Sequence, residues 1–133
     1  MTPAAPDGSP GSPFSVILCD DNVTLLGTLS EVVQAQPDLK VVGTACNGEQ
    51  ALRLTDLHQP DLVILDVRFP GGGPSVARDI GRSSPASRIV AFSAYDDKGS
   101  VEQMMSAGVT EYVLKGASNK ELVAALRRAA AQR

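Results

Sequence analysis

The sequence of 133 residues contains no tryptophan, one histidine and two cysteines, so it has few of the residues on which several protein classes depend. Two cysteines are too few for a disulfide framework, and we expect Cys19 and Cys46 to be reduced and buried. The single histidine, His58, precedes Ser75, which stands in a loose nucleophile-elbow pattern. Hydrolases of that class carry the histidine after the serine, so the residue order does not favour a serine hydrolase.

Long apolar runs and basic residues are also scarce. No run approaches the roughly 20 residues that cross a bilayer. The N-terminus lacks the basic and apolar regions of a signal peptide, so we expect a cytoplasmic protein with no membrane partner. The 12 Lys and Arg residues are outnumbered by 15 Asp and Glu residues, and the net charge of -3 gives no electrostatic footprint for direct nucleic-acid binding.

The first 13 residues are almost wholly Pro, Gly, Ala and Ser. Such a segment cannot bury enough apolar area to offset its chain entropy, so residues 1–13 are predicted to be a disordered tail. The remainder, residues 14–133, has the length and the apolar content of one folded domain.

Short apolar strands alternate with amphipathic helices through this remainder. Five strands are predicted, at Ser15–Leu18, Leu39–Ala45, Leu62–Leu65, Arg88–Ser93 and Glu111–Leu114. Each strand is followed by a predicted helix. The first helix spans Val23–Gln34 with Asn22 as its N-cap, and the second starts at Asn47-Gly48 with Leu57 on its apolar side. A short third helix spans Ser75–Ile80 and is ended by Gly81, the fourth spans Val101–Ala107 with Gly108 as its C-cap, and the last is opened by the capping box Ser118-Asn119-Lys120-Glu121. The alternation predicts an α/β fold with helices on both faces of a doubly wound parallel five-stranded sheet.

The central predicted strand, Leu62–Leu65, delivers one carboxylate to its end. Four consecutive apolar residues are typical of a strand buried on both faces. Asp66 follows them directly, and a Pro- and Gly-rich segment, residues 70–73, then forces a loop. Ligands of open α/β sheets bind beyond the carboxyl ends of the strands, so Asp66 is placed for chemistry rather than only for capping a turn.

Polar residues also follow the other strands. Asp20 and Asp21 follow the first predicted strand, Ser93 ends the fourth and Lys115 follows the fifth, and in a parallel sheet these ends meet at one edge. Three crowded carboxylates repel one another unless a cation is present, and Mg²⁺ suits such a set of oxygen ligands. Lys115 and Ser93 fit a tetrahedral anion, so the residues predict an Asp66 that is itself phosphorylated.

With these residues, the chain resembles the receiver domains of two-component response regulators, from about Phe14 to Ala130. The matching pieces are Asp20-Asp21, Asp66 followed by Pro70-Gly71, Ser93-Ala94, and Ala107-Gly108 leading to Tyr112-Val113-Leu114-Lys115. The Lys-Gly-Ala-Ser sequence from Lys115 is similar to the LuxR/NarL-like subgroup, whose receivers are attached to helix-turn-helix effectors. The resemblance implies a flavodoxin-like (βα)5 fold with strand order 2-1-3-4-5.

The resemblance also implies the roles of the site residues. Asp66 would accept a phosphoryl group from a sensor histidine kinase or a small acyl phosphate. Asp21, Asp66 and the backbone carbonyl of Arg68 would bind Mg²⁺ directly, with Asp20 acting partly through water. Lys115 and Ser93 would contact the phosphoryl oxygens.

A signalling role follows from the same resemblance. Ser93 and Tyr112 would form the switch, with Tyr112 turning inward as Ser93 moves toward the phosphoryl group. The domain would control a downstream effector protein or domain, could form a homodimer on phosphorylation, and would catalyse only its own phosphorylation and dephosphorylation. Arg68 and Tyr95 flank the site and are predicted to set the lifetime of the phosphoryl group by shielding it from water.

The chain departs from the family pattern in two places. Phe69 stands where the family usually has Met, which concerns the packing of the loop rather than the chemistry. Gly116 stands where many receivers have Pro, so we expect a looser loop after Lys115.

Other interpretations remain open at this stage. The chain could be the N-terminal receiver part of a LuxR-type DNA-binding transcription regulator. A metal-dependent aspartyl phosphatase would carry a second acid two residues past its nucleophile, where this chain has Arg68. Asp20 and Asp21 could simply favour a helix N-terminus, and Tyr112 could be an ordinary core residue.

Overall fold

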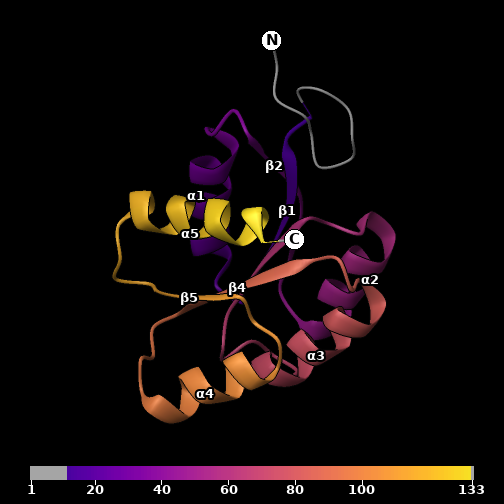
Figure 1. Cartoon of the computed structure of the whole chain (residues 1–133), viewed down its shortest axis with the longest axis vertical. Coiled ribbons are helices and arrows are strands. Elements are labelled where there is room, and N and C mark those ends of the chain that lie inside the picture. Colours follow the sequence, from indigo (N-terminus) through magenta and orange to yellow (C-terminus); the bar gives the residue numbers. More distant parts are fainter. Residues whose placement is uncertain (1–11, 133) are drawn as a thin grey trace.

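The computed structural model describes residues 12–132, in which five strands alternate with five helices (Figure 1). The elements are β1 Phe14–Cys19, α1 Val23–Gln34, β2 Leu39–Ala45, α2 Gly48–His58, β3 Leu62–Leu65, α3 Gly73–Ser83, β4 Arg88–Ser93, α4 Lys98–Ser106, β5 Glu111–Leu114 and α5 Asn119–Ala131. Most of the predicted disordered tail, residues 1–11, lies outside the described residues.

All five strands are parallel and form one sheet in the order β2-β1-β3-β4-β5, which confirms the predicted fold class. The register brings the carboxyl ends of neighbouring strands to the same edge. Cys19 at the end of β1 is opposite Leu65 at the end of β3, and Leu65 is opposite Ala91 in β4. The residues that follow these strands therefore start from one edge of the sheet.

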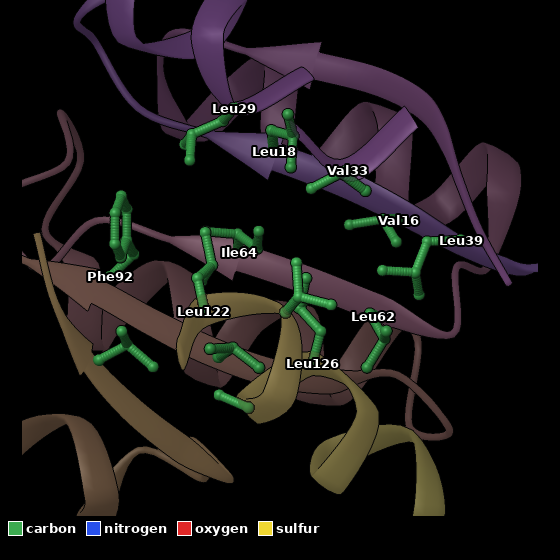
Figure 2. Packing of buried hydrophobic residues seen from close by; sticks show 14 of the residues in the cluster. Val16, Leu18, Leu29, Val33, Leu39, Leu62, Ile64, Phe92, Leu122 and Leu126 are labelled. Carbon is green, nitrogen blue, oxygen red and sulfur yellow. The ribbon is translucent and has the colours of Figure 1, made fainter. Parts of the chain in front are cut away.

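The sheet divides the interior into two apolar clusters. The first lies between the sheet and the helices α1 and α5, and the second lies beneath α2, α3 and α4 (Figure 1). Successive side chains of a strand point to opposite faces, so Val16 and Leu18 belong to the first cluster and Ile17 to the second. Figure 2 shows Leu122 and Leu126 of α5 packing toward the β3 side chains within the first cluster.

Side-chain caps fix where most of the helices begin. The N-cap side chains of α1, α2, α4 and α5 accept a backbone N–H from the residue three positions later; they belong to Asn22, Asn47, Asp97 and Ser118. The cap at Asp97 explains why α4 begins at Lys98, three residues before the predicted start. In α5 the capping box is only half formed, because the Glu121 carboxylate accepts from Arg128.

Two expectations about α2 and α3 were wrong. Gly81 does not end α3, which continues to Ser83: the position faces open space, and Gln59 Nε2 donates to the Ser83 carbonyl 3.0 Å away. Leu57 is not on the buried side of α2 and is 72% exposed, because the buried face of that helix is made by Ala51 and Thr55.

The expectation for the two cysteines, reduced and buried, was confirmed only in part. Cys19 and Cys46 are free thiols, and burial raises the pKa of the Cys19 thiol, which keeps it protonated. Cys46 is only partly buried. Phe69 is 2% exposed and fills space in the second cluster, so this departure from the family pattern is accommodated as core packing. No helix within residues 12–132 has the length and apolarity needed to cross a membrane.

The helices differ in how firmly they are anchored. Six residues of α5 are buried, whereas Met104 is the one buried residue within the bounds of α4. The core beneath α4 is completed by Ala107 and Val109, which follow the helix.

The loop between β3 and α3 folds back tightly at Gly73, whose N–H donates to the Val67 carbonyl. A Cβ at Gly73 would clash with the backbone carbonyl of Val67, and no rotamer relieves this clash because the position of a Cβ is fixed by the backbone. We expect Gly73→Ala to lower the free energy of unfolding by about 1–3 kcal/mol. The matched change Gly81→Ala, in open space in the same helix, should raise it by about 0.4–1 kcal/mol. Urea unfolding of both variants measures the two effects, and equal midpoints would contradict the tight turn.

Candidate phosphorylation site

Three carboxylates meet at the carboxyl edge of the sheet. Asp20 and Asp21 follow β1, Asp66 follows β3, and one carboxylate oxygen from each lies within 4.8 Å of the others. Asp20 and Asp66 are 2% and 6% exposed, whereas Asp21 is open to solvent. The structure thus brings together the three acids that the sequence placed at the ends of two strands.

Lys115 completes this group from the end of β5, the outermost strand on that side of the sheet. Its backbone N–H donates to the Ser93 carbonyl over 2.7 Å, which fixes the end of β5 against the end of β4. Its ammonium nitrogen lies 2.7 Å from Asp20 Oδ2 and 3.6 Å from Asp66 Oδ2. Lys115 therefore balances part of the negative charge of the buried carboxylates.

A repeated turn orients the side chains at three strand ends. Each of them accepts the backbone N–H of the residue two positions later, as Asx- and ST-turns do. The pairs are Asn22 N to Asp20 Oδ1 at 2.9 Å, Arg68 N to Asp66 Oδ1 at 3.3 Å, and Tyr95 N to Ser93 Oγ at 3.0 Å. Local backbone geometry therefore aims these oxygens before any ligand is bound.

Asp66 is the acid of this site whose pKa is shifted. Burial raises its pKa most strongly, and the charges of Asp20 and Asp21 raise it further. The charge of Lys115 and the Arg68 N–H act in the opposite direction without cancelling this effect. A second cation would relieve the remaining repulsion, and three carboxylates with one side open to solvent suit the oxygen ligands and retained waters of Mg²⁺.

The two predicted switch residues are linked through Tyr95. Ser93 is fully buried and its hydroxyl oxygen accepts the Tyr95 N–H. Tyr112 is half-buried against the second cluster, and its hydroxyl donates to the Tyr95 carbonyl. Tyr112 is thus partly a core residue and partly a polar contact of the β4–α4 loop.

Sequence reasoning placed Arg68 and Tyr95 beside the site but did not foresee their contact. The Arg68 guanidinium carbon lies 4.1 Å from the centre of the Tyr95 ring, so a cation–π contact joins the β3–α3 loop to the β4–α4 loop. No local sequence signal predicts such a contact between two loops.

A cleft of about 520 Å³ opens beside Ser93 and Lys115. Its small lining residues include Ala94 and Gly116, and a Cβ at Gly116 would meet no atom within 4 Å. The small side chain of Ala94 leaves this cleft open, and the open space at Gly116 agrees with the expected looser loop after Lys115.

The structure does not bring Ser75 and His58 together as the catalytic pair of a serine hydrolase. Ser75 is exposed in the first turn of α3 and His58 is exposed at the end of α2. Both residues are thus open to solvent and do not share a buried site. Asp66, not Ser75, is the candidate nucleophile with neighbouring charged groups.

Comparisons with known proteins agree with this geometry. The chain is 34% identical to the nitrate/nitrite response regulator protein NarL of Escherichia coli over 120 residues, which are 90% of this chain and 56% of that protein. It is 32% identical to the transcriptional regulatory protein PdtaR of Mycobacterium tuberculosis over 127 residues, 95% of this chain and 61% of that protein. The chain therefore spans little more than half the length of these relatives.

Solved structures and a family model give the same result. The signal receiver domain of the putative response regulator NarL from Mycobacterium tuberculosis matches with a TM-score of 0.85 and 31% identity, covering 92% of this chain and 99% of that one. A LuxR-family two-component response regulator from Aurantimonas matches with a TM-score of 0.86 and 29% identity, covering 92% and 88%. The family model of the response regulator receiver domain matches residues 16–127. The chain accordingly belongs to the receiver domains of two-component response regulators, of the NarL/LuxR type.

Proposed function

We propose that Asp66 is the phosphoacceptor of this receiver domain. The observation that carries the proposal is the position of its carboxylate at the end of β3, buried, 3.6 Å from the Lys115 ammonium and within a cluster of three acids. A carboxylate oxygen of Asp66 attacks phosphorus, and the bond between phosphorus and the donor breaks. The donor leaves with the electron pair, and the product is an acyl phosphate on Asp66.

The neighbouring residues have distinct tasks in this step. Lys115 neutralises charge on the phosphoryl oxygens, and the Ser93 hydroxyl donates to one of them. Asp20, Asp21, Asp66 and the backbone carbonyl of Arg68 would hold Mg²⁺, with Asp20 acting partly through water. When bound there, Mg²⁺ supplies positive charge beside the phosphoryl oxygens.

The switch acts through α4 and β5. Phosphorylation adds about -1.5 to -2 charges near the β4–α4 loop. Drawing Ser93 and Lys115 toward this charge shifts the loop that Tyr112 contacts, and α4 follows. Moving a two-state equilibrium from mostly inactive to mostly active takes roughly 5.5 kcal/mol, which several charge-assisted hydrogen bonds of about 1.5–3 kcal/mol each can supply.

The wider role follows from the family. The phosphoryl donor is a sensor histidine kinase, and the output is a downstream effector protein or domain, with a homodimer as one form that phosphorylation favours. We infer that residues 14–133 form the receiver and that it works in the cytoplasm. Its catalysis is confined to its own phosphorylation and dephosphorylation.

The test is the intact mass after incubation with acetyl phosphate and Mg²⁺, beside a sample containing EDTA. We expect the gain of one phosphoryl group that requires Mg²⁺ and is removed by hydroxylamine, as an acyl phosphate is. Borohydride reduction followed by peptide mapping should locate it at Asp66. A phosphoryl group on another residue, or no mass gain together with no binding of beryllofluoride, would overturn the proposal.

A further inference from the structure

A groove of about 500 Å³ runs between α2 and α3, on the face of the sheet that α1 and α5 do not cover (Figure 1). Its lining residues are Leu52, Arg53 and Asp56 of α2 and Asp79, Arg82 and Ser83 of α3. Long charged side chains bury their carbon stems along apolar surface and keep their charged ends in water. The groove therefore has partly apolar walls and a rim of four charges.

These four charges occur in opposite order on the two helices. In α2 the cation Arg53 precedes the anion Asp56 by three residues, whereas in α3 the anion Asp79 precedes the cation Arg82 by three residues. The strands on either side of each helix are parallel, so both helices run back from the carboxyl edge of the sheet and share one direction. The sign of the charge therefore alternates along each helix, and the two alternations are opposed.

The side chain of Gln59 shows that the two helices end at the same level. Its Nε2 donates to the Asp56 carbonyl of α2 over 3.1 Å and to a carbonyl in the last turn of α3 over 3.0 Å. Asp56 thus lies across the groove from the turn that holds Arg82, and Arg53, one turn earlier, lies across from the turn that holds Asp79. Each charge of the rim has charges of opposite sign as its neighbours, both along its helix and across the groove.

Contacts within the chain leave these charges available. Arg82 pairs with Asp79 at 2.7 Å, and Arg53 pairs with an acid of its own helix at 2.9 Å, but exposed ion pairs of this kind contribute little free energy. Asp56 forms no ion pair with any of residues 12–132. Leu57 follows Arg53 by one helical turn and is 72% exposed, so it adds apolar area beside the groove.

An alternating set of charges is complementary to itself. If two copies face each other and are related by a twofold axis along the groove, Arg53 opposes Asp79 of the second copy and Asp56 opposes its Arg82. If the axis runs across the groove, Arg53 opposes Asp56 of the second copy and Asp79 opposes its Arg82. Both arrangements place each cation against an anion, whereas a partner surface of one sign would repel two of the four charges.

We propose that the groove between α2 and α3 binds the same groove of a second copy of this chain, which gives a weak twofold dimer. The groove residues are separate from the three acids at the carboxyl edge and from the cleft beside Lys115. The dimer therefore forms without phosphorylation of Asp66, and it is distinct from a homodimer that phosphorylation favours. Because its contacts are largely exposed charges, it weakens as the salt concentration rises.

The first experiment is sedimentation of the unphosphorylated protein in EDTA, at concentrations up to about 1 mM. We expect a dimer at about 20 mM salt, and a dissociation constant at least about tenfold higher at about 500 mM salt, where charges are screened over a few ångströms. The amide signals of α2 and α3 should shift with protein concentration. A monomer at every concentration in low salt, association that salt does not weaken, or shifts confined to α1, α4 or α5 would overturn the proposal.

The second experiment reverses one charge and then restores the match. Arg53→Asp should raise the dissociation constant about tenfold or more, because it places two anions face to face with either axis. Adding Asp79→Arg should restore the dimer if the axis runs along the groove, and adding Asp56→Arg should restore it if the axis runs across. Restoration means a dissociation constant within about threefold of the wild-type value, in a protein with an unchanged circular dichroism spectrum.

Lys98→Glu is the matched control, because Lys98 is an exposed cation on α4 whose reversal changes the net charge by the same amount as Arg53→Asp. It should leave the dissociation constant within about twofold of the wild-type value. The proposal would be wrong if neither double variant restored association, or if Lys98→Glu weakened the dimer as much as Arg53→Asp does.

Discussion

Asp66→Asn is expected to abolish the gain of a phosphoryl group from acetyl phosphate while leaving the protein folded. Asparagine keeps the size of the side chain but has no carboxylate oxygen to attack phosphorus. Among the acids of residues 12–132, only Asp20 offers the same combination of burial and closeness to Lys115, and its Oδ2 is already paired with that ammonium at 2.7 Å. Intact mass measures the result, with Asp56→Asn on the exposed side of α2 as the control. A mass gain in Asp66→Asn equal to that of the wild type would assign the chemistry to another residue.

The same substitution should make the metal-free protein more stable at neutral pH. The pKa of the Asp66 carboxyl is raised in the folded state, so the folded protein binds this proton more tightly than the unfolded chain does. The stability that this proton gives is complete below the ordinary aspartate pKa of about 4 and is lost as the pH rises through the raised value.

The expected gain from Asp66→Asn, measured in EDTA by urea unfolding, is therefore about 0.5–2 kcal/mol at pH 7, the range typical of relieving an unfavourable charge. The gain should shrink when the unfolding is repeated near pH 4, because the raised pKa of the wild-type carboxyl makes the folded protein take up this proton as the pH falls. A variant less stable than the wild type at pH 7 would show that the contact with Lys115 outweighs burial.

Lys115→Met is expected to slow the phosphorylation of Asp66 by about 10²–10³-fold, the usual cost of removing one group that stabilises developing charge. The ammonium lies between Asp20 and Asp66, where it can follow the phosphoryl oxygens as they approach. Methionine keeps most of the length of the side chain and removes the charge. The initial rate of mass gain with acetyl phosphate at saturating Mg²⁺ measures the effect.

Lys120→Met is the matched control, because Lys120 is exposed on α5. Lys115→Arg distinguishes charge from geometry: it keeps a cation, and its loss should be smaller than that of Lys115→Met. A Lys115→Met rate within threefold of the wild type, with an unchanged circular dichroism spectrum, would contradict the role of the ammonium.

The arrangement of the acids could be predicted because it depends on the backbone alone. An apolar block such as Leu62–Leu65 indicates a buried parallel strand, and parallel strands bring their carboxyl ends to one edge. Asp20, Asp66 and Lys115 could therefore be placed together from their positions in the chain, before any side-chain contact was known. The helix N-caps could also be predicted, as at Asn22, because a cap depends only on neighbouring residues in the chain.

Features that depend on distant parts of the chain could not be predicted. The extension of α3 beyond Gly81 depends on open space and on a bond from Gln59, neither of which the local sequence reveals. The exposure of Leu57 depends on which face of α2 meets α3 and the sheet. The Arg68–Tyr95 contact joins residues of two separate loops, and it is too weak to determine the conformation of either loop by itself.

The shallow anchoring of α4 has a consequence for what the molecule can transmit. Lifting α4 from the sheet uncovers one buried side chain of its own, Met104, whereas lifting α5 would uncover six. Local opening of α4 should therefore need only a fraction of the global unfolding free energy, while opening of α5 should approach it. A small energy released at the edge of the sheet can thus be converted into a change of shape at α4 without loosening the rest of the fold.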